Sequence, residues 1–392
     1  MMTADFNRHS MRRPIIALHR SPTLVGFANL AAAMGIARFA LTPLLPFMQQ
    51  SFGLTLAQGG WLAAVNYLGY LGGAILSIGL RRHLETMARW GLLAIALSTL
   101  GMGLTTSPFW WASWRFVSGL AGAFVLIGTS TWALTEFARG GRPHAAGTLF
   151  AGVGVGIAVA GLVALVAGVS GAGPQPAWVV LGLVVMAAAA LAWPVLRAST
   201  AATSAVDQGA SERFGPGGWL LIACYSAAGF GYIIPATYIP AAARLLIADP
   251  LIFGWAWPVF GTAAALSTLV ATRWSSRATP RSLFGAALLL MGVGTLAPAL
   301  SLSPTTLLLS ALSVGGTFML ATMASMQEAR RVLPHASGKL IATMTTGFAL
   351  AQLAGPLLVN ASRSSSAFGW PSVLAACLLL LASAVLLIRR NL

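Results

Sequence analysis

The chain has 392 residues, of which 57% are apolar and only 8% charged, and its mean hydropathy is +0.82. This number of polar groups is too small to cover the surface of a soluble protein. The composition therefore predicts an integral membrane protein. The formal charge of +16 would fit a nucleic-acid partner, but the positions of the charges, given below, exclude one.

Apolar runs long enough to cross a bilayer of roughly 30 Å follow one another along the chain. They do not alternate with polar residues, which favours transmembrane helices over transmembrane strands. Six are expected at about 23–48, 55–80, 87–106, 108–137, 144–170 and 177–196, and six more at about 218–245, 252–273, 281–302, 305–329, 335–360 and 367–388. The expected fold is an all-α membrane protein with twelve transmembrane helices.

Two polar segments divide the chain. An Arg-rich tail over 1–22 precedes an apolar run that is too long for a signal-peptide core, so we expect this run to be retained as the first helix. A stretch rich in Ser, Thr, Ala and Gly over 198–217 predicts a flexible linker. The linker separates an N-terminal bundle, 23–197, from a C-terminal bundle, 218–392.

The two bundles carry related sequences. PHAAGTL begins at Pro143 and PHASGKL at Pro334, and each follows a Glu-x-x-Arg that begins at Glu136 or Glu328. The lead helices repeat a Gly and a Pro at the same spacing, and under their offset of 194 residues Tyr232 is the counterpart of Arg38. Because both copies carry the same basic loop, the bundles must enter the membrane in the same orientation. This predicts six plus six helices related by a pseudo-twofold axis along the membrane normal.

The basic residues follow the positive-inside pattern. If the N-terminus is cytoplasmic, all but four of the 23 Lys and Arg residues fall on that side, as do the five His residues. The charge is therefore a topology signal rather than a nucleic-acid site. We expect a multi-pass protein of the bacterial inner membrane with both termini in the cytoplasm.

Several segments resemble the YbfB/YjiJ-type branch of the major facilitator superfamily. They are GIARFALTPLLPFM (35–48), GGWLAAVNYLGYLGG (59–73), RFVSGLAG (115–122), GVGVGIAVAG (152–161), GFGYIIPATYIP (229–240), GGTFMLATMASMQEARR (315–331) and FALAQLAGPLL (348–358). The resemblance implies a single-chain carrier whose halves rock about a central cavity. One departure is that GLRRHLETMARWG (79–91) has no Asp beside Arg81 and Arg82, where the superfamily usually carries one.

Arg38 is the first candidate for the site, because it lies about 22 Å along the first helix and hence near the middle of the bilayer. A central Arg costs ~2.5 to 3.5 kcal/mol on insertion scales, which favours a wet cavity or a partner over lipid. It could bind an anionic group of a solute, or hydrogen-bond carbonyls freed by Pro43 and Pro46. The expected lining of the cavity consists of Arg38, Asn66, Tyr70, Tyr225, Tyr232, Tyr238 and Gln352.

Arg115 and the acidic residues are the candidates for gating or coupling. The resemblance implies that Arg115 handles protons or substrate, whereas three nearby Trp residues favour an interfacial anchor. No carboxylate is expected at mid-membrane, but Glu136 and Glu328 are expected at matching cytoplasmic ends. Pairs of Glu136 with Arg81 or Arg82, and of Glu328 with Arg273 or Arg277, would form a gate that opens and closes.

The chain shows no P-loop, nucleophile elbow, metal-binding spacing of His and Cys, or paired catalytic carboxylates. We therefore expect a monomeric secondary carrier, not an enzyme, with no cofactor and no metal. Its expected cargo is a small amphipathic organic solute, with a carboxylate as one option and proton coupling permitted. The alternatives are a drug efflux carrier for neutral or cationic compounds and, behind it, a membrane receptor or membrane-embedded enzyme.

Overall fold

The computed structural model describes residues 21–80, 83–142, 144–199, 213–247, 254–274, 278–361 and 368–388. These residues form long helices and no strand. The N-terminal half comprises α2 (Pro22–Leu30), η1 (Ala31–Ala37), α3 (Leu41–Phe52), α4 (Leu56–Gly79), α5 (Leu84–Leu104), α6 (Pro108–Arg139), α7 (Ala145–Ser170) and α8 (Pro174–Ser199). The C-terminal half comprises α9 (Pro216–Leu246), α11 (Ala256–Trp274), α12 (Pro280–Leu300), α13 (Pro304–Val332), η3 (Pro334–Ala336), α14 (Ser337–Ala361) and α15 (Trp370–Ile388).

Eleven segments within the described residues are long and apolar enough to cross a membrane. The first of them joins α2, η1 and α3 into one span, Pro22–Phe52. The helix α11 occupies the position of the remaining predicted span, and Arg273 and two Trp residues lower its hydropathy. The expected all-α membrane fold with two six-helix halves is therefore confirmed.

Local sequence explains where many of these helices begin and end. Thr55 and Ser303 form capping boxes with residues three positions later, which satisfies free N–H groups at the first turns of α4 and α13. Several helices begin with Pro, whose missing N–H is harmless in the first turn. Gly53 ends α3 and Gly171 ends α7, both with the positive φ that glycine adopts most easily.

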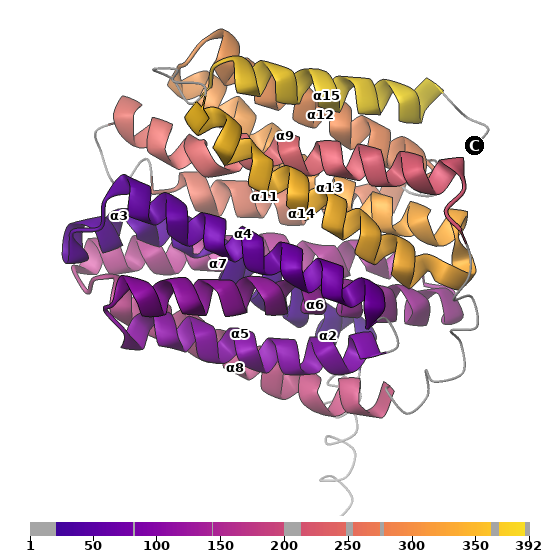
Figure 1. The fold of residues 1–392 in the computed structure, drawn as a ribbon, viewed down its shortest axis with the longest axis horizontal. Coiled ribbons are helices and arrows are strands. Elements are labelled where there is room, and N and C mark those ends of the chain that lie inside the picture. The colour runs from indigo at the N-terminus through magenta and orange to yellow at the C-terminus, as the bar shows by residue number, and fades with distance from the viewer. Residues whose placement is uncertain are drawn as a thin grey trace, which may run out of the picture.

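The two halves meet along two helix pairs, α4 with α14 and α7 with α11. In Figure 1, α14 runs beside α4 at the boundary between the indigo-to-magenta and the orange-to-yellow halves. The duplication makes α4 the counterpart of α11, and α7 the counterpart of α14. A twofold axis along the membrane normal therefore converts one helix pair into the other.

A glycine stripe at seven-residue spacing forms the α7 side of the second helix pair. Gly147, Gly154 and Gly161 lie so close to α11 that an added Cβ would meet its atoms. Their neighbours on α11 are Thr268, Gly261 and Pro258, in the same order. Small residues let helix backbones approach closely within a membrane, so this interface depends on the missing side chains.

The first span is not one regular α-helix, although its sequence predicts a single apolar run. A π-helical segment, η1, interrupts it over Ala31–Ala37, and a turn at Ala40 separates η1 from α3. Pro43 lacks the N–H that would bond to the carbonyl of Phe39, so the normal ladder cannot continue there. Such π-segments are frequent at functional sites, and Arg38 follows this one directly.

Candidate functional site

Arg38 lies at the centre of a buried polar cluster that joins the two halves. Its side chain is 5% exposed, and its Nη2 donates hydrogen bonds to Tyr232 Oη at 3.3 Å and to Gln352 Oε1. Tyr232 comes from α9 and Gln352 from α14, both in the C-terminal half. The guanidinium also lies over the ring of Tyr70 of α4, 4.1 Å from its centroid. The cluster therefore draws on helices from both halves.

Arg38 and Tyr232 meet because they are counterparts in the duplication. Their separation along the chain is 194 residues, so the pseudo-twofold axis brings them to the same depth on opposite sides. The sequence placed them across a cavity from each other, and the structure brings their side chains into a hydrogen bond. At this pair of positions the N-terminal half contributes a charge and the C-terminal half a neutral hydroxyl.

Hydrogen-bond donors remain available in this cluster. Arg38 Nε and Nη1 are buried and make no hydrogen bond within the described part of the chain. Tyr232 Oη accepts from Arg38 Nη2 and from Gln352 Nε2, the latter at 2.6 Å, so its own hydroxyl hydrogen can go to a further acceptor. None of the described carboxylates forms an ion pair with Arg38. The cluster therefore offers positive charge and donors without an internal anion.

Aromatic rings of the C-terminal half line one side of the cluster. Tyr232 stacks between Phe318 of α13 and Phe348 of α14, with centroid distances of 5.6 Å and 5.4 Å. Tyr225 stacks on the other side of Phe348 at 4.7 Å and donates to Thr322 Oγ1. The two tyrosines could be predicted from the sequence, but the two phenylalanines could not, because apolar residues on apolar helices carry no distinguishing pattern.

Arg115 holds the backbone of the first span. From α6, its Nη1 donates to the carbonyl of Ala37 at 2.8 Å and its Nη2 to the carbonyl of Arg38 at 3.2 Å. Asn66 of α4 in turn donates to the carbonyl of Arg115 at 2.8 Å. Arg115 is only 2% exposed, whereas an interfacial anchor would be partly exposed to solvent. Arg115 therefore bonds two carbonyls beside the broken helix, whereas the hydrogen bonds of Arg38 go to side chains of the C-terminal half.

The acidic residues expected at the gate pair within their own helices. Glu136 pairs with Arg139 at 2.9 Å, and Glu328 pairs with Arg331 at 3.1 Å, both at i,i+3 spacing. Arg273 is exposed and forms no ion pair with Glu328 in this structure. The other expected partners, Arg81, Arg82 and Arg277, lie outside the described residues.

A contact that the sequence did not predict joins the halves near these acids. Nη1 of Arg330, in the last turn of α13, donates to Thr135 Oγ1 of α6 at 2.8 Å. The neighbouring Arg331 could be found from its repeat partner Arg139, but Arg330 has no basic counterpart to mark it. Tyr238, the remaining predicted lining residue, is partly buried and packs against the core.

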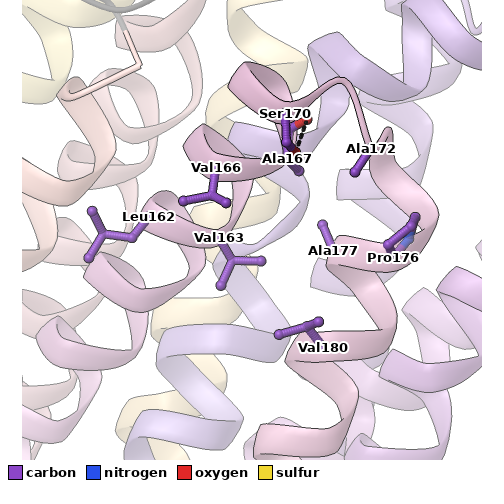
Figure 2. A pocket seen from close by; sticks show the side chains of 9 residues that line it. All are labelled: Leu162, Val163, Val166, Ala167, Ser170, Ala172, Pro176, Ala177 and Val180. Carbon is purple, nitrogen blue, oxygen red and sulfur yellow. Dashed lines mark hydrogen bonds between the residues drawn. The ribbon is translucent and has the colours of Figure 1, made fainter.

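A separate cavity of about 300 Å³ lies between α7 and α8. Figure 2 shows its apolar lining, in which Leu162 and Val166 of α7 lie opposite Val180 of α8. It contains none of the predicted site residues, so it is distinct from the central cluster. Ser170 supplies a hydroxyl, but that group already donates to the Ala167 carbonyl.

The twelve-helix arrangement and the twofold-related helix pairs define a multi-pass membrane protein with the major facilitator fold. The chain belongs to the family described as "Uncharacterised MFS-type transporter YbfB", whose model matches residues 30–387. This is a family of transporters and not of enzymes.

Two comparisons show what this chain resembles. It is 32% identical over 101 residues to the "Uncharacterized MFS-type transporter YceJ" of Bacillus subtilis, a match that spans 25% of this chain and 26% of that protein. The solved human "organic anion transporter MFSD10 (TETRAN)" superposes with a TM-score of 0.69 at 16% identity. That superposition covers 94% of this chain and 99% of the human chain, and at this identity it shows the fold alone.

Proposed function

We propose that this protein is a secondary carrier for a small amphipathic organic anion, whose carboxylate binds Arg38 between the two halves. The carrier works by alternating access as a monomer in a bacterial inner membrane, with both termini in the cytoplasm. The observation that supports this most directly is the buried Arg38, which has free N–H donors and no carboxylate partner among the described residues.

Energetics favour an anion as the cargo. A buried charge without an ionic partner is costly, and hydrogen bonds to a charged group contribute about 1.5 to 3 kcal/mol each. A carboxylate could accept from Arg38 Nη2 together with Nε or Nη1, and from the Tyr232 hydroxyl, once it replaces the Gln352 oxygen on Nη2. The stacked rings of Tyr232, Phe318 and Phe348 would then pack against its apolar part. The name of the human structural neighbour gives organic anions as the cargo of that protein, which has the same sign of charge.

Transport by purified protein in proteoliposomes tests this proposal. The panel would contain aromatic and aliphatic monocarboxylates, dicarboxylates, and neutral and cationic drugs. Arg38→Ala should reduce uptake of the preferred anion by about 30-fold, which corresponds to ~2 kcal/mol of lost charge-assisted bonding. Arg38→Lys should retain part of the activity, because it keeps the charge but loses the planar donor pair.

Arg142→Ala is the matched control, because it removes a positive charge from an exposed loop outside the cluster. Anion uptake that is equal in wild type and Arg38→Ala would overturn the proposal. Transport restricted to cationic or neutral compounds would overturn it in favour of drug efflux.

A further inference from the structure

Gln352 occupies the position at Arg38 that a carboxylate would take. Its Oε1 accepts from Arg38 Nη2, and its Nε2 donates to Tyr232 Oη at 2.6 Å. The second bond fixes the orientation of the amide, so that its oxygen and not its nitrogen faces the guanidinium. The side chain of Gln is close in shape to that of Glu, but it carries no formal charge. Gln352 therefore presents Arg38 with a neutral copy of a carboxylate oxygen.

This contact crosses the boundary between the halves. Arg38 belongs to the first span, whereas Gln352 belongs to α14, which packs against α4 as one of the two inter-half helix pairs. Both side chains are buried, Gln352 completely. An alternating-access carrier must reorient its halves with this arginine enclosed, and a guanidinium without an acceptor is expensive in a low-dielectric interior.

We propose that Gln352 is a built-in substitute for the carboxylate of the solute, and that it lets the carrier reorient without cargo. In the loaded carrier the anion displaces Gln352 Oε1, because a carboxylate makes a stronger bond to guanidinium than a neutral amide does. In the unloaded carrier Gln352 returns to Arg38, so the return step does not enclose an unpartnered charge. The protein can thus perform net transport instead of strict anion-for-anion exchange.

A full carboxylate at position 352 would not serve this purpose. Glu would form a buried ion pair with Arg38, which the solute could not easily displace. An apolar residue would leave Arg38 with only the Tyr232 hydroxyl when no solute is bound. The neutral amide is strong enough to support the empty carrier and weak enough to give way, so Gln352 determines the mode of transport. This inference rests on the proposed function.

Two transport modes measured on the same proteoliposomes test it. Net uptake of a labelled monocarboxylate is measured into vesicles without internal anion, and exchange is measured into vesicles preloaded with the same compound. Gln352→Leu should lower net uptake at least tenfold and leave exchange within about threefold of wild type, because only the unloaded return step needs the amide. The exchange activity shows at the same time that the variant is folded.

A second variant and a control complete the experiment. Gln352→Glu should raise the anion concentration for half-maximal exchange at least tenfold, because the internal carboxylate competes with the solute. Gln175→Leu, at the start of α8 and outside the cluster, should change neither mode. Equal loss of both modes in Gln352→Leu, or no loss in either, would overturn this inference and leave the proposed function intact. Wild-type protein that transports no anion in either mode would overturn both.

Discussion

Replacing Arg115 with Met should loosen the first span at the point where Arg38 is anchored. Met is similar in length and apolar, so it preserves the packing of α6 but removes the donors to the carbonyls of Ala37 and Arg38. Because η1 and the following turn already interrupt the helical ladder, those carbonyls depend more than usual on this side chain. We therefore expect a loss of both stability and solute affinity.

The size of the stability loss follows from two opposing contributions. Two hydrogen bonds from a charged donor contribute about 1.5 to 3 kcal/mol each, or roughly 3 to 6 kcal/mol together. Removing a buried Arg recovers the ~2.5 to 3.5 kcal/mol that its placement in the membrane costs. The midpoints of the two ranges, about 4.5 and about 3 kcal/mol, leave a net destabilisation of roughly 1.5 kcal/mol. Solute affinity should fall by about tenfold, because the Arg38 backbone is no longer fixed.

Two measurements check this expectation. Thermal unfolding of purified Arg115→Met should begin several degrees below wild type, and Arg142→Met, in an exposed loop, should unfold with wild type. Binding of the preferred anion should require about ten times more ligand in Arg115→Met, and Arg115→Lys should fall between the two because it keeps one donor. Unchanged unfolding together with unchanged affinity would refute the interpretation of Arg115 as the residue that positions Arg38.

Two further predictions concern the contacts between the halves. Gly154→Ala should reduce transport by at least tenfold without abolishing membrane insertion, because its Cβ would meet backbone atoms of Ala265 and Gly261 that cannot move aside; equal transport by Gly154→Ala and by Gly60→Ala, at an exposed helical glycine with open space around it, would contradict this. Arg330→Met should remove the bond to Thr135 and increase labelling of single cysteines at that end of the bundle by about threefold; unchanged labelling in Arg330→Met would show that this contact does not hold the halves together.

Much of the fold could be predicted from the sequence because the bilayer imposes a simple requirement on helix length and apolarity. The twelve expected runs correspond to the observed helices within a few residues at most ends. The duplication also predicted a spatial relation between the halves, because it placed Arg38 and Tyr232 at equivalent positions without any information on contacts. The π-segment Ala31–Ala37 could not be predicted, since a run of small apolar residues looks the same in an α-helix and a π-helix.

The partners of the charged groups were harder to predict than their positions. Arg115 could be placed near the N-terminal end of α6. The carbonyls that it bonds belong to another helix, so its partners depend on how the two helices pack. The pairs of Glu136 with Arg139 and of Glu328 with Arg331 could have been expected, because residues three apart share a helix face. The predicted partners, in contrast, were basic residues expected in neighbouring loops.

The difference between the halves explains why the site should select an anion with a single charge. Two guanidinium groups, those of Arg38 and Arg115, are buried near the centre, but the Arg115 group bonds to backbone carbonyls and only the Arg38 group keeps free Nη1 and Nε donors. From the C-terminal half the cluster receives a phenol, an amide and aromatic rings, and no described Lys or Arg of that half contacts it. A second carboxylate would therefore enter the cluster without a cationic partner and would lose its hydration without compensation. For this reason the transport panel should rank monocarboxylates above dicarboxylates of the same size.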